Sequence, residues 1–476
     1  MSDKTVLLWL RQDLRTRDNP ALLAAAAAGR VLPVYIVDES GQDTWPMGEA
    51  GRWWLHQSLS DLNGTLHNRL WMFRGDPEVI LPELAAEHGA EAVYWNRCYE
   101  PWRTARDGRL KKTLQEAGLE VTSSNGSLLW EPWEVLKADD TPYKVFTPYF
   151  TKGCRQAAEP RLPLKSPEEL SLADCSQPHS RIDDLGLMPA RDWYTSLDEA
   201  WQPGENGAAE RLEKFLSSGL ELYKKGRDFP ALEAVSRLSP YLHFGEISPN
   251  QAWYRVQQEM QARGLEVQGE HFQRELGWRE FSYSLLYHFP HLPRQNLQKK
   301  FDSFPWHDNP DAFHQWCRGM TGYPIIDAGM RELWQTGYMH NRVRMIVASF
   351  LVKNLLIHWH RGEDWFWDCL VDADLANNSA SWQWVAGCGA DAAPYFRIFN
   401  PVTQGLKFDP QGEYVRRFVP EIADLPDKYI HDPSSAPAGV LTAAGVVLGK
   451  TYPQAMVDLR ESRLRALEAF KTLSGQ

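Results

Sequence analysis

Short apolar runs alternate with helix-period segments over the first 130 residues. The pair Asn19-Pro20 is typical of a helix start, and the alanine-rich segment after it stops at Gly29. Apolar runs of strand length flank this helix, and a strand–helix–strand unit joins parallel strands. The pattern predicts strands at 6–10, 31–37, 92–95 and 119–122, and a second helix at 105–117. We therefore expect an α/β N-terminal domain with a parallel, Rossmann-like sheet.

The periodicity is lost after residue 130, and it returns as a purely helical pattern. Prolines and short acidic clusters dominate residues 131–205, which predicts an interdomain linker on the surface. Helix-period segments follow at 208–220, 249–262, 272–286, 327–335, 341–358 and 454–473. The expected organisation is an α/β domain at 1–130, a linker at 131–205 and an all-α C-terminal domain at 206–476.

Composition and charge agree with a globular protein of more than one domain. The chain has 476 residues, of which 43% are hydrophobic and 24% are charged. The formal net charge of −11 counts against a protein that coats DNA or membrane by bulk charge. The excess is uneven, because residues 1–200 carry 22 basic and 30 acidic side chains, whereas residues 201–476 carry 29 and 32. The helical part can therefore present a local basic face.

Several classes of site are not supported by the sequence. The longest apolar stretches, Ala21–Ala28 and Met345–Val352, are too short to span a bilayer, and Arg11 interrupts the first apolar run, so we expect neither a membrane span nor a signal peptide. No GxGxxG or GxxxxGK[ST] motif occurs. The cysteines are expected to be reduced thiols and not metal ligands; they are Cys98, Cys154, Cys175, Cys317, Cys369 and Cys388.

Three polar groups in the helical part have two interpretations each. Glu275 and Arg279 form either a surface ion pair, worth about 0.2–0.5 kcal/mol, or, with Trp278, the wall of a pocket. Asn341 and Arg344 are either a helix cap and a solvated cation or the polar edge of a buried ligand site. The segment 372–384 holds two Asp, two Asn and two Trp, which favours binding of a ligand with hydroxyl groups and a heterocycle.

These polar groups belong to a wider pattern, in which the chain resembles the photolyase/cryptochrome flavoproteins along nearly its whole length. The motifs that carry the resemblance are WLRQDLR at 9–15, SRLSPYL at 236–242, ELGWREF at 275–281, TGYPIID at 321–327, MHNR at 339–342, WQW at 382–384 and DAAPYFRIFNP at 391–401. The pattern is most similar to class I-like bacterial cyclobutane pyrimidine dimer photolyases. The resemblance implies an α/β antenna domain and a helical domain that binds FAD in a folded shape.

The resemblance assigns residues to the flavin. Phosphate-side residues would be Tyr223, Val235, Ser236, Arg237, Leu238 and Ser239. Phe272 would pack on the cofactor where close relatives have Trp, Arg344 would pair with Asp372, and Asp372, Ala373 and Asp374 would meet the ribityl and adenosine groups. Asn378 would lie beside the flavin N5. Because plant-type cryptochromes place Asp there, Asn378 favours a fully reduced flavin (FADH⁻) and repair over signalling.

It also assigns residues to damaged DNA. The lesion would meet Glu275, Trp278, Asn341, Met345 and Trp384, and phosphates would meet Arg227, Arg279, Arg342, Arg397, Gln404 and Lys407. The pair His340-Asn341 is typical of enzymes that repair cyclobutane dimers, whereas (6-4) photolyases have His-His. Excited FADH⁻ would give one electron to the flipped-out dimer and regain it after the ring splits, with Glu275, Asn341 and Asn378 as catalytic residues.

The tryptophan content, 21 residues, acquires a meaning from the same resemblance. Trp382, Trp359 and Trp306 match the family's electron-transfer chain, although a lone Trp more often serves core packing. At the antenna, Trp102-Arg103 replaces the Asn-Glu pair of folate-binding relatives. A deazaflavin, a flavin, a folate held differently and no antenna all stay open.

The main hypothesis is a light-driven DNA lyase that acts on UV-damaged single- or double-stranded DNA. It would be a cytoplasmic bacterial monomer, associated with the nucleoid when bound to DNA and with no membrane partner. The alternatives are a cryptochrome-like blue-light receptor, a (6-4) photolyase and a dark-acting flavin oxidoreductase. The first would usually carry a long polar C-terminal extension, and the last would need a substrate acid/base pair that the sequence does not suggest.

Overall fold

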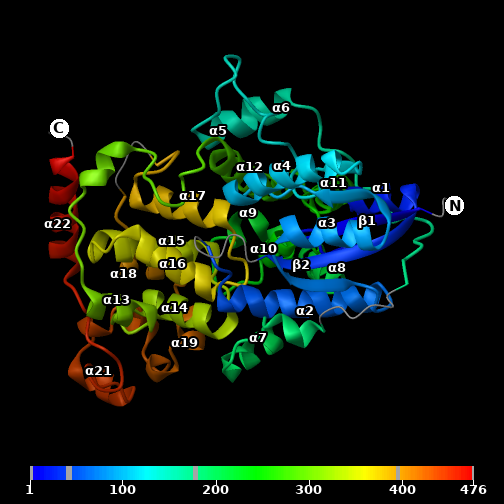
Figure 1. The fold of residues 1–476 in the computed structure, drawn as a ribbon. Coiled ribbons are helices and arrows are strands. Elements are labelled where there is room, and N and C mark those ends of the chain that lie inside the picture. The colour runs from blue at the N-terminus through cyan, green and yellow to red at the C-terminus, as the bar shows by residue number, and fades with distance from the viewer. Residues whose placement is uncertain (1–3, 39–44, 175–180, 393–396, 474–476) are drawn as a thin grey trace. The chain divides into compact units, whose positions relative to one another are not determined.

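The structure, a computed structural model, describes residues 4–38, 45–174, 181–392 and 397–473 and divides into two compact units (Figure 1). Unit 1 comprises Met1–Glu221, Ser236–Pro290 and Val371–Ala376, and unit 2 comprises Leu222–Val235, His291–Leu370 and Asn377–Gln476. The units interleave along the sequence. The boundaries predicted at residues 130 and 205 therefore stay a prediction.

Unit 1 contains a parallel sheet of five strands in the order β3-β2-β1-β4-β5. The strands are β1 (Thr5–Leu10), β2 (Arg30–Asp38), β3 (Trp71–Gly75), β4 (Ala90–Asn96) and β5 (Glu120–Ser124). This confirms the predicted Rossmann-like α/β architecture. Only β3 was not predicted; its sequence, WMFRG, has a short apolar run and buries just its first two residues.

The helices of the α/β part begin where the sequence places capping residues. They are α1 (Pro20–Ala28), α2 (Glu49–Thr65), α3 (Pro77–Glu87) and α4 (Pro101–Glu116). The Asn19 side chain accepts a hydrogen bond from the backbone N–H of Leu22, which confirms its predicted role as N-cap. α2 and α3 were not predicted.

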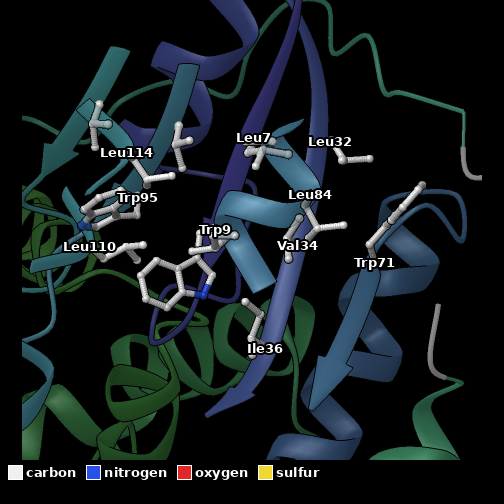
Figure 2. Packing of buried hydrophobic residues seen from close by; sticks show 14 of the residues in the cluster. Leu7, Trp9, Leu32, Val34, Ile36, Trp71, Leu84, Trp95, Leu110 and Leu114 are labelled. Carbon is white, nitrogen blue, oxygen red and sulfur yellow. The ribbon is translucent and has the colours of Figure 1, made fainter. Parts of the chain in front are cut away.

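Large aromatic residues fill the core around the sheet. Trp9 of β1 and Trp95 of β4 meet edge to face, with ring centroids 5.8 Å apart, and both are about 1% exposed. Figure 2 shows them among the leucines of neighbouring strands and helices, including Leu7, Leu84 and Leu110. Burying an indole of this size stabilises the fold by roughly 4–6 kcal/mol through the hydrophobic effect. These two tryptophans therefore serve core packing.

The segment 131–205 has mostly irregular backbone with only short helices. These are α5 (Phe146–Pro148), α6 (Cys154–Gln156) and α7 (Thr195–Ala200), with a π-helical turn at Tyr149–Gly153. The expectation that the segment lies on the surface is wrong for several of its aromatic residues. Phe146, Tyr149 and Trp201 are at most 5% exposed and belong to the core of unit 1. Their irregular spacing produces no hydrophobic period that sequence reading could detect.

Within the described part of 206–476, every regular element is a helix, as predicted. Unit 1 contributes α8 (Glu205–Lys214), α10 (Ser239–Phe244), α11 (Pro249–Arg263) and α12 (Glu266–His288). Unit 2 contributes α9 (Tyr223–Gly226), α13 (Pro310–Cys317), α14 (Pro324–Thr336), α15 (Asn341–Ser349), α16 (Trp359–Cys369), α18 (Pro401–Phe408), α19 (Glu413–Phe418), α20 (Asp427–Ile430), α21 (Ala438–Ala443) and α22 (Leu459–Thr472). The helix α17 (Leu375–Ala386) begins in unit 1 and continues in unit 2.

The helix predicted over 341–358 is wrong at its C-terminal end. α15 stops at Ser349, a π-helical turn follows at Phe350–Asn354, and Leu356 adopts a positive φ of 55°. His358 then caps α16 by accepting a hydrogen bond from the backbone N–H of His360. The apolar period continues through this break because the turn is also buried, so hydrophobicity alone could not reveal it.

None of the helices that the structure describes is long and apolar enough to cross a membrane. Cys98, Cys154, Cys317, Cys369 and Cys388 are buried and unbridged, and Cys175 lies outside the described residues. The described side chains include no cluster of His, Cys, Asp or Glu that could hold a metal ion.

Candidate functional site

The residues expected at the flavin are distributed over both units. In unit 1, Asp374 lies in a buried polar network. It accepts a hydrogen bond from the Tyr283 hydroxyl, and its Oδ2 lies 3.3 Å from Nδ1 of His243. Burial acts to raise the pKa of Asp374, but these two partners and the charge of Arg279 outweigh it and hold the pKa at about 2. Asp374 is therefore an ionised, fixed acceptor at neutral pH.

The segment 235–239 is linked to Asp372 within the same unit. The Ser239 hydroxyl donates to Oδ2 of Asp372 over 2.5 Å at the start of α10. Arg237 adopts a left-handed conformation, with a φ of 53°, and its guanidinium lies 4.5 Å from the Trp201 ring centroid. Left-handed residues in such turns occur in backbone nests that bind anions, which fits a phosphate-side segment. Phe272 of α12 packs on Phe215, with ring centroids 4.9 Å apart.

In unit 2, the side chain of Asn378 is held by the backbone of α16. Its Nδ2 donates to the carbonyl oxygen of Glu363 over 3.0 Å, and the neighbouring Ser379 hydroxyl donates to Oε1 of Glu363 over 2.6 Å. Because Nδ2 is engaged with the main chain, Oδ1 is the atom of this amide that can accept from an N–H group of a ligand. Sequence reading missed Glu363, since a glutamate followed by an aspartate gives no sign of burial.

The other predicted flavin residues of unit 2 also have defined neighbours. Tyr223 is 5% exposed, and the guanidinium of Arg227 lies 5.4 Å from its ring. Nε of Arg344 donates to the carbonyl oxygen of Met339 over 2.7 Å. The predicted pair of Arg344 with Asp372 joins residues of different units and stays a prediction. The donor set fits FAD: buried carboxylates suit ribityl and ribose hydroxyls, and the amide of Asn378 suits a flavin N–H.

Glu363 predicts a measurable dependence of stability on pH. Its carboxyl group is fully buried, and burial raises its pKa from 4.5 to about 8, although Ser379 and Arg294 oppose the shift. A carboxyl whose pKa is raised by folding stabilises the protein fully below the unfolded pKa, and this contribution is lost as the pH rises through about 8. Across that window, Glu363→Gln should reduce the loss of unfolding free energy by up to about 1.4 kcal/mol per pH unit.

Urea unfolding of the protein at several pH values between 5 and 8 measures this effect. Asp364→Asn is the matched control, because Asp364 follows Glu363 in the chain but its side chain is 51% exposed. It should change the pH dependence of stability far less than Glu363→Gln does, because the charge of Asp364 raises the pKa of Glu363 less than burial does. Equal pH slopes for Glu363→Gln and the unmodified protein would contradict the role of the buried carboxyl.

Three of the predicted DNA-side residues lie on α12 in unit 1. Glu275 and Trp278 are partly exposed, and Trp278 stacks face to face on Phe146. Arg279 is only 9% exposed; its Nη1 donates to the carbonyl oxygen of Ser127 over 2.8 Å and lies 3.1 Å from Oε1 of Glu280. This burial counts against the phosphate contact predicted for Arg279.

In unit 2, α15 carries two of the residues predicted to meet the lesion, Asn341 and Met345. Asn341 is exposed and Met345 lies one turn later, while Arg342 forms a 2.7 Å ion pair with Asp228. His340, just before the helix, is 3% exposed and caps it through Nδ1. Burial lowers the pKa of His340 to about 3. The imidazole of His340 is therefore neutral at physiological pH. It caps the helix from a buried position, whereas its neighbour Asn341 is exposed.

The remaining DNA-side residues of unit 2 lie on α17, on α18 and just before α18. Nε1 of Trp384 donates to the carbonyl oxygen of Asp391 over 3.1 Å. Arg397 and Lys407 are exposed, and Gln404 is partly exposed on the same helix as Lys407. Residues 393–396 of the motif at 391–401 lie outside the described residues. The two cations are accessible to a polyanion, and their predicted contact with DNA phosphates stays a prediction.

The three tryptophans of the predicted electron path belong to unit 2; two of them are buried and the third is partly exposed. Trp382 and Trp359 are 2% and 0% exposed, and Trp306 is only partly buried. The ring of His358 lies 4.9 Å from that of Trp306 and 5.7 Å from that of Trp359. Gly362 lets α16 approach Trp382, because a Cβ there would lie 2.1 Å from the indole. Sequence reading missed both His358 and Gly362, since their contacts are not visible in a motif.

At the predicted antenna position, α4 begins with Trp102-Arg103. Nη1 of Arg103 lies 3.3 Å from Oε1 of Glu100, and the same oxygen accepts from Nε2 of Gln12 over 2.9 Å. The polar groups at this helix start are thus paired with one another. Their arrangement does not select among the antenna chromophores left open above.

Comparison with known proteins identifies the family of this chain. A model described as DNA photolyase matches residues 6–168, and one described as the FAD binding domain of DNA photolyase matches 272–472. The deoxyribodipyrimidine photo-lyase of Agrobacterium fabrum is 49% identical over 99% of this chain and 98% of its own length. Cryptochrome-2 of Arabidopsis thaliana is 39% identical over 97% of this chain and 78% of its own length.

Solved structures agree with the sequence relatives. A class III photolyase from Agrobacterium tumefaciens matches with a TM-score of 0.96 and 48% identity, over 100% of this chain and 99% of that chain. An archaeal photolyase from Sulfolobus tokodaii with two FAD molecules matches with a TM-score of 0.82 and 30% identity, over 98% and 100%. The first neighbour is described as class III, whereas the sequence pattern predicted a class I-like enzyme. The chain belongs to the DNA photolyase family, with an α/β N-terminal part and a helical FAD-binding part.

Proposed function

We propose that this protein repairs cyclobutane pyrimidine dimers in UV-damaged DNA with blue light. The observation that carries the choice of lesion is the pair His340-Asn341. His340 is a buried, neutral helix cap whose pKa is lowered to about 3 by burial, so it is not an acid that could protonate a (6-4) photoproduct. Asn341 instead offers an exposed amide. The full-length similarity to a photo-lyase, 49% against 39% for a cryptochrome, supports repair over signalling.

Reduced FAD, when bound and excited, supplies the electron that splits the dimer, and the protein's residues prepare the dimer to accept it. Trp278 and Trp384 each offer an indole face to flipped-out bases. The Glu275 carboxyl group would hydrogen-bond a thymine carbonyl and stabilise the negative charge that develops there. Asn341 and Met345 offer a polar and an apolar contact one helical turn apart. Asn378, fixed by Glu363, would accept from the flavin N5–H.

Exposed and partly exposed polar side chains of unit 2 would bind the DNA backbone. These are Arg227, Arg342, Arg397, Gln404 and Lys407. Phosphate contacts of this kind give affinity that depends on salt and little on sequence. We further propose that the protein acts as a monomer in the cytoplasm and associates with the nucleoid when bound to DNA. Its 48% identity to the class III neighbour supports that subclass. The antenna chromophore is not assigned.

The decisive experiment illuminates the reduced, FAD-loaded protein with UV-irradiated oligo(dT) and follows the recovery of thymine absorbance. We expect recovery under blue light and none in the dark. An oligonucleotide that contains a (6-4) photoproduct should show no repair under the same illumination. Absence of recovery with bound, reduced FAD would refute the repair function and leave the photoreceptor alternative.

A further inference from the structure

The lesion-side indole of Trp278 is one member of a column of aromatic rings in unit 1. Its ring stacks on Phe146 with centroids 3.8 Å apart and planes inclined by 14°. Phe150 is also stacked with Phe146, with ring centroids 5.7 Å apart and planes inclined by 19°. Phe146 and Phe150 come from the irregular segment 131–205, so this segment shapes the surroundings of a residue on α12. One face of the indole is thus covered by protein.

Further contacts from α12 surround these stacked rings. Phe281, which is 1% exposed, meets both Phe146 and Trp278 edge on, with centroids 6.0 and 5.8 Å away. Gly277 lets Phe150 lie directly against α12, because a Cβ at this position would be 2.4 Å from the Phe150 ring. The guanidinium of Arg274 lies 5.4 Å from the Phe146 ring. Phe146 itself is 1% exposed, so it has no room to follow a rotation of the indole.

We propose that Phe146 is a positioning residue for lesion recognition, which holds the plane of Trp278 so that a flipped-out pyrimidine dimer stacks as the next ring of the column. The inference rests on the lesion-binding role of Trp278 in the proposed function. An indole that is already fixed loses no rotamer freedom when the dimer binds, whereas a free indole would lose it. Phe146 therefore contributes to the preference for damaged DNA without touching the DNA.

The test measures binding in the dark, so that it does not depend on repair. Fluorescence anisotropy compares an oligonucleotide with one thymine dimer and the same undamaged oligonucleotide, using the FAD-loaded protein. Phe146→Leu should reduce the ratio of the two affinities about three- to tenfold, the range that corresponds to the ordering of one side chain. Affinity for undamaged DNA and the repair yield per bound dimer should not change. Phe146→Tyr, which keeps the ring, should retain the preference.

Control variants separate this inference from general packing and from the proposed function. Phe150→Leu removes a ring from the same column but leaves the pair of Phe146 and Trp278, and it should retain at least half of the preference. An equal loss in Phe146→Leu and Phe150→Leu, or no loss in Phe146→Leu, would overturn the inference. If Phe146→Leu does not fold, Phe146→Met applies the same criterion. If Trp278→Ala keeps the preference, the lesion-binding role of Trp278 itself fails.

Discussion

Trp382→Phe is expected to block the photoreduction of oxidised flavin and to leave repair by pre-reduced protein intact. Trp382 is 2% exposed and packs against Phe366, with ring centroids 5.0 Å apart, so a phenyl ring fits the same space. A phenyl group is far harder to oxidise than an indole. Each 1.36 kcal/mol added to a barrier slows a step about tenfold. Because the harder oxidation adds more than this to the barrier, the rate of flavin photoreduction should fall by much more than about tenfold. Absorbance changes of the flavin under continuous blue light measure it.

Trp316→Phe provides the matched control for this variant. Trp316 is fully buried, and its ring lies 6.4 Å from that of Trp382, but it is not part of the predicted path. The same substitution there should therefore leave photoreduction close to that of the unmodified protein. If the pre-reduced Trp382→Phe protein also fails to repair dimers, or if its photoreduction survives, the proposed electron path is wrong.

Glu275→Ala is expected to lower the yield of dimer repair more than the affinity for damaged DNA. The carboxyl group would interact mainly with charge that develops on the dimer, and an interaction of this type acts on the reaction more than on binding. For a partly exposed side chain we expect a loss of about tenfold in repair yield, below the hundredfold cost of removing a donor from a closed site. Single-turnover illumination and dark binding measure the two quantities separately.

Glu270→Ala, an exposed position on the same helix, is the control for a change of charge on α12. It should alter neither quantity. Glu275→Gln keeps a hydrogen-bond donor and should retain more repair than Glu275→Ala. Equal losses of repair yield and affinity in Glu275→Ala would show that Glu275 only binds DNA.

The elements that could be predicted from the sequence are those whose signal is local. Asn19 and the proline after it mark the start of α1, and the apolar runs around it mark β1 and β2, because capping and strand propensity act over a few residues. The edge strand β3 escaped prediction, since it buries only one end. The break after α15 escaped as well, because Phe350–Asn354 is as apolar and buried as a helix.

The chemistry of the site follows the same division. The amino-acid sequence by itself determined which residue types are present, such as Asn at 378, the His340-Asn341 pair and the spaced tryptophans, because these are written in short motifs. Only the tertiary structure decided how they are held: Glu363 orients Asn378, and Phe146 backs Trp278 from a segment predicted to be a linker. It also removed Arg279 from the expected phosphate contacts by burying it. Burial depends on residues distant in the chain, and no local pattern encodes those contacts.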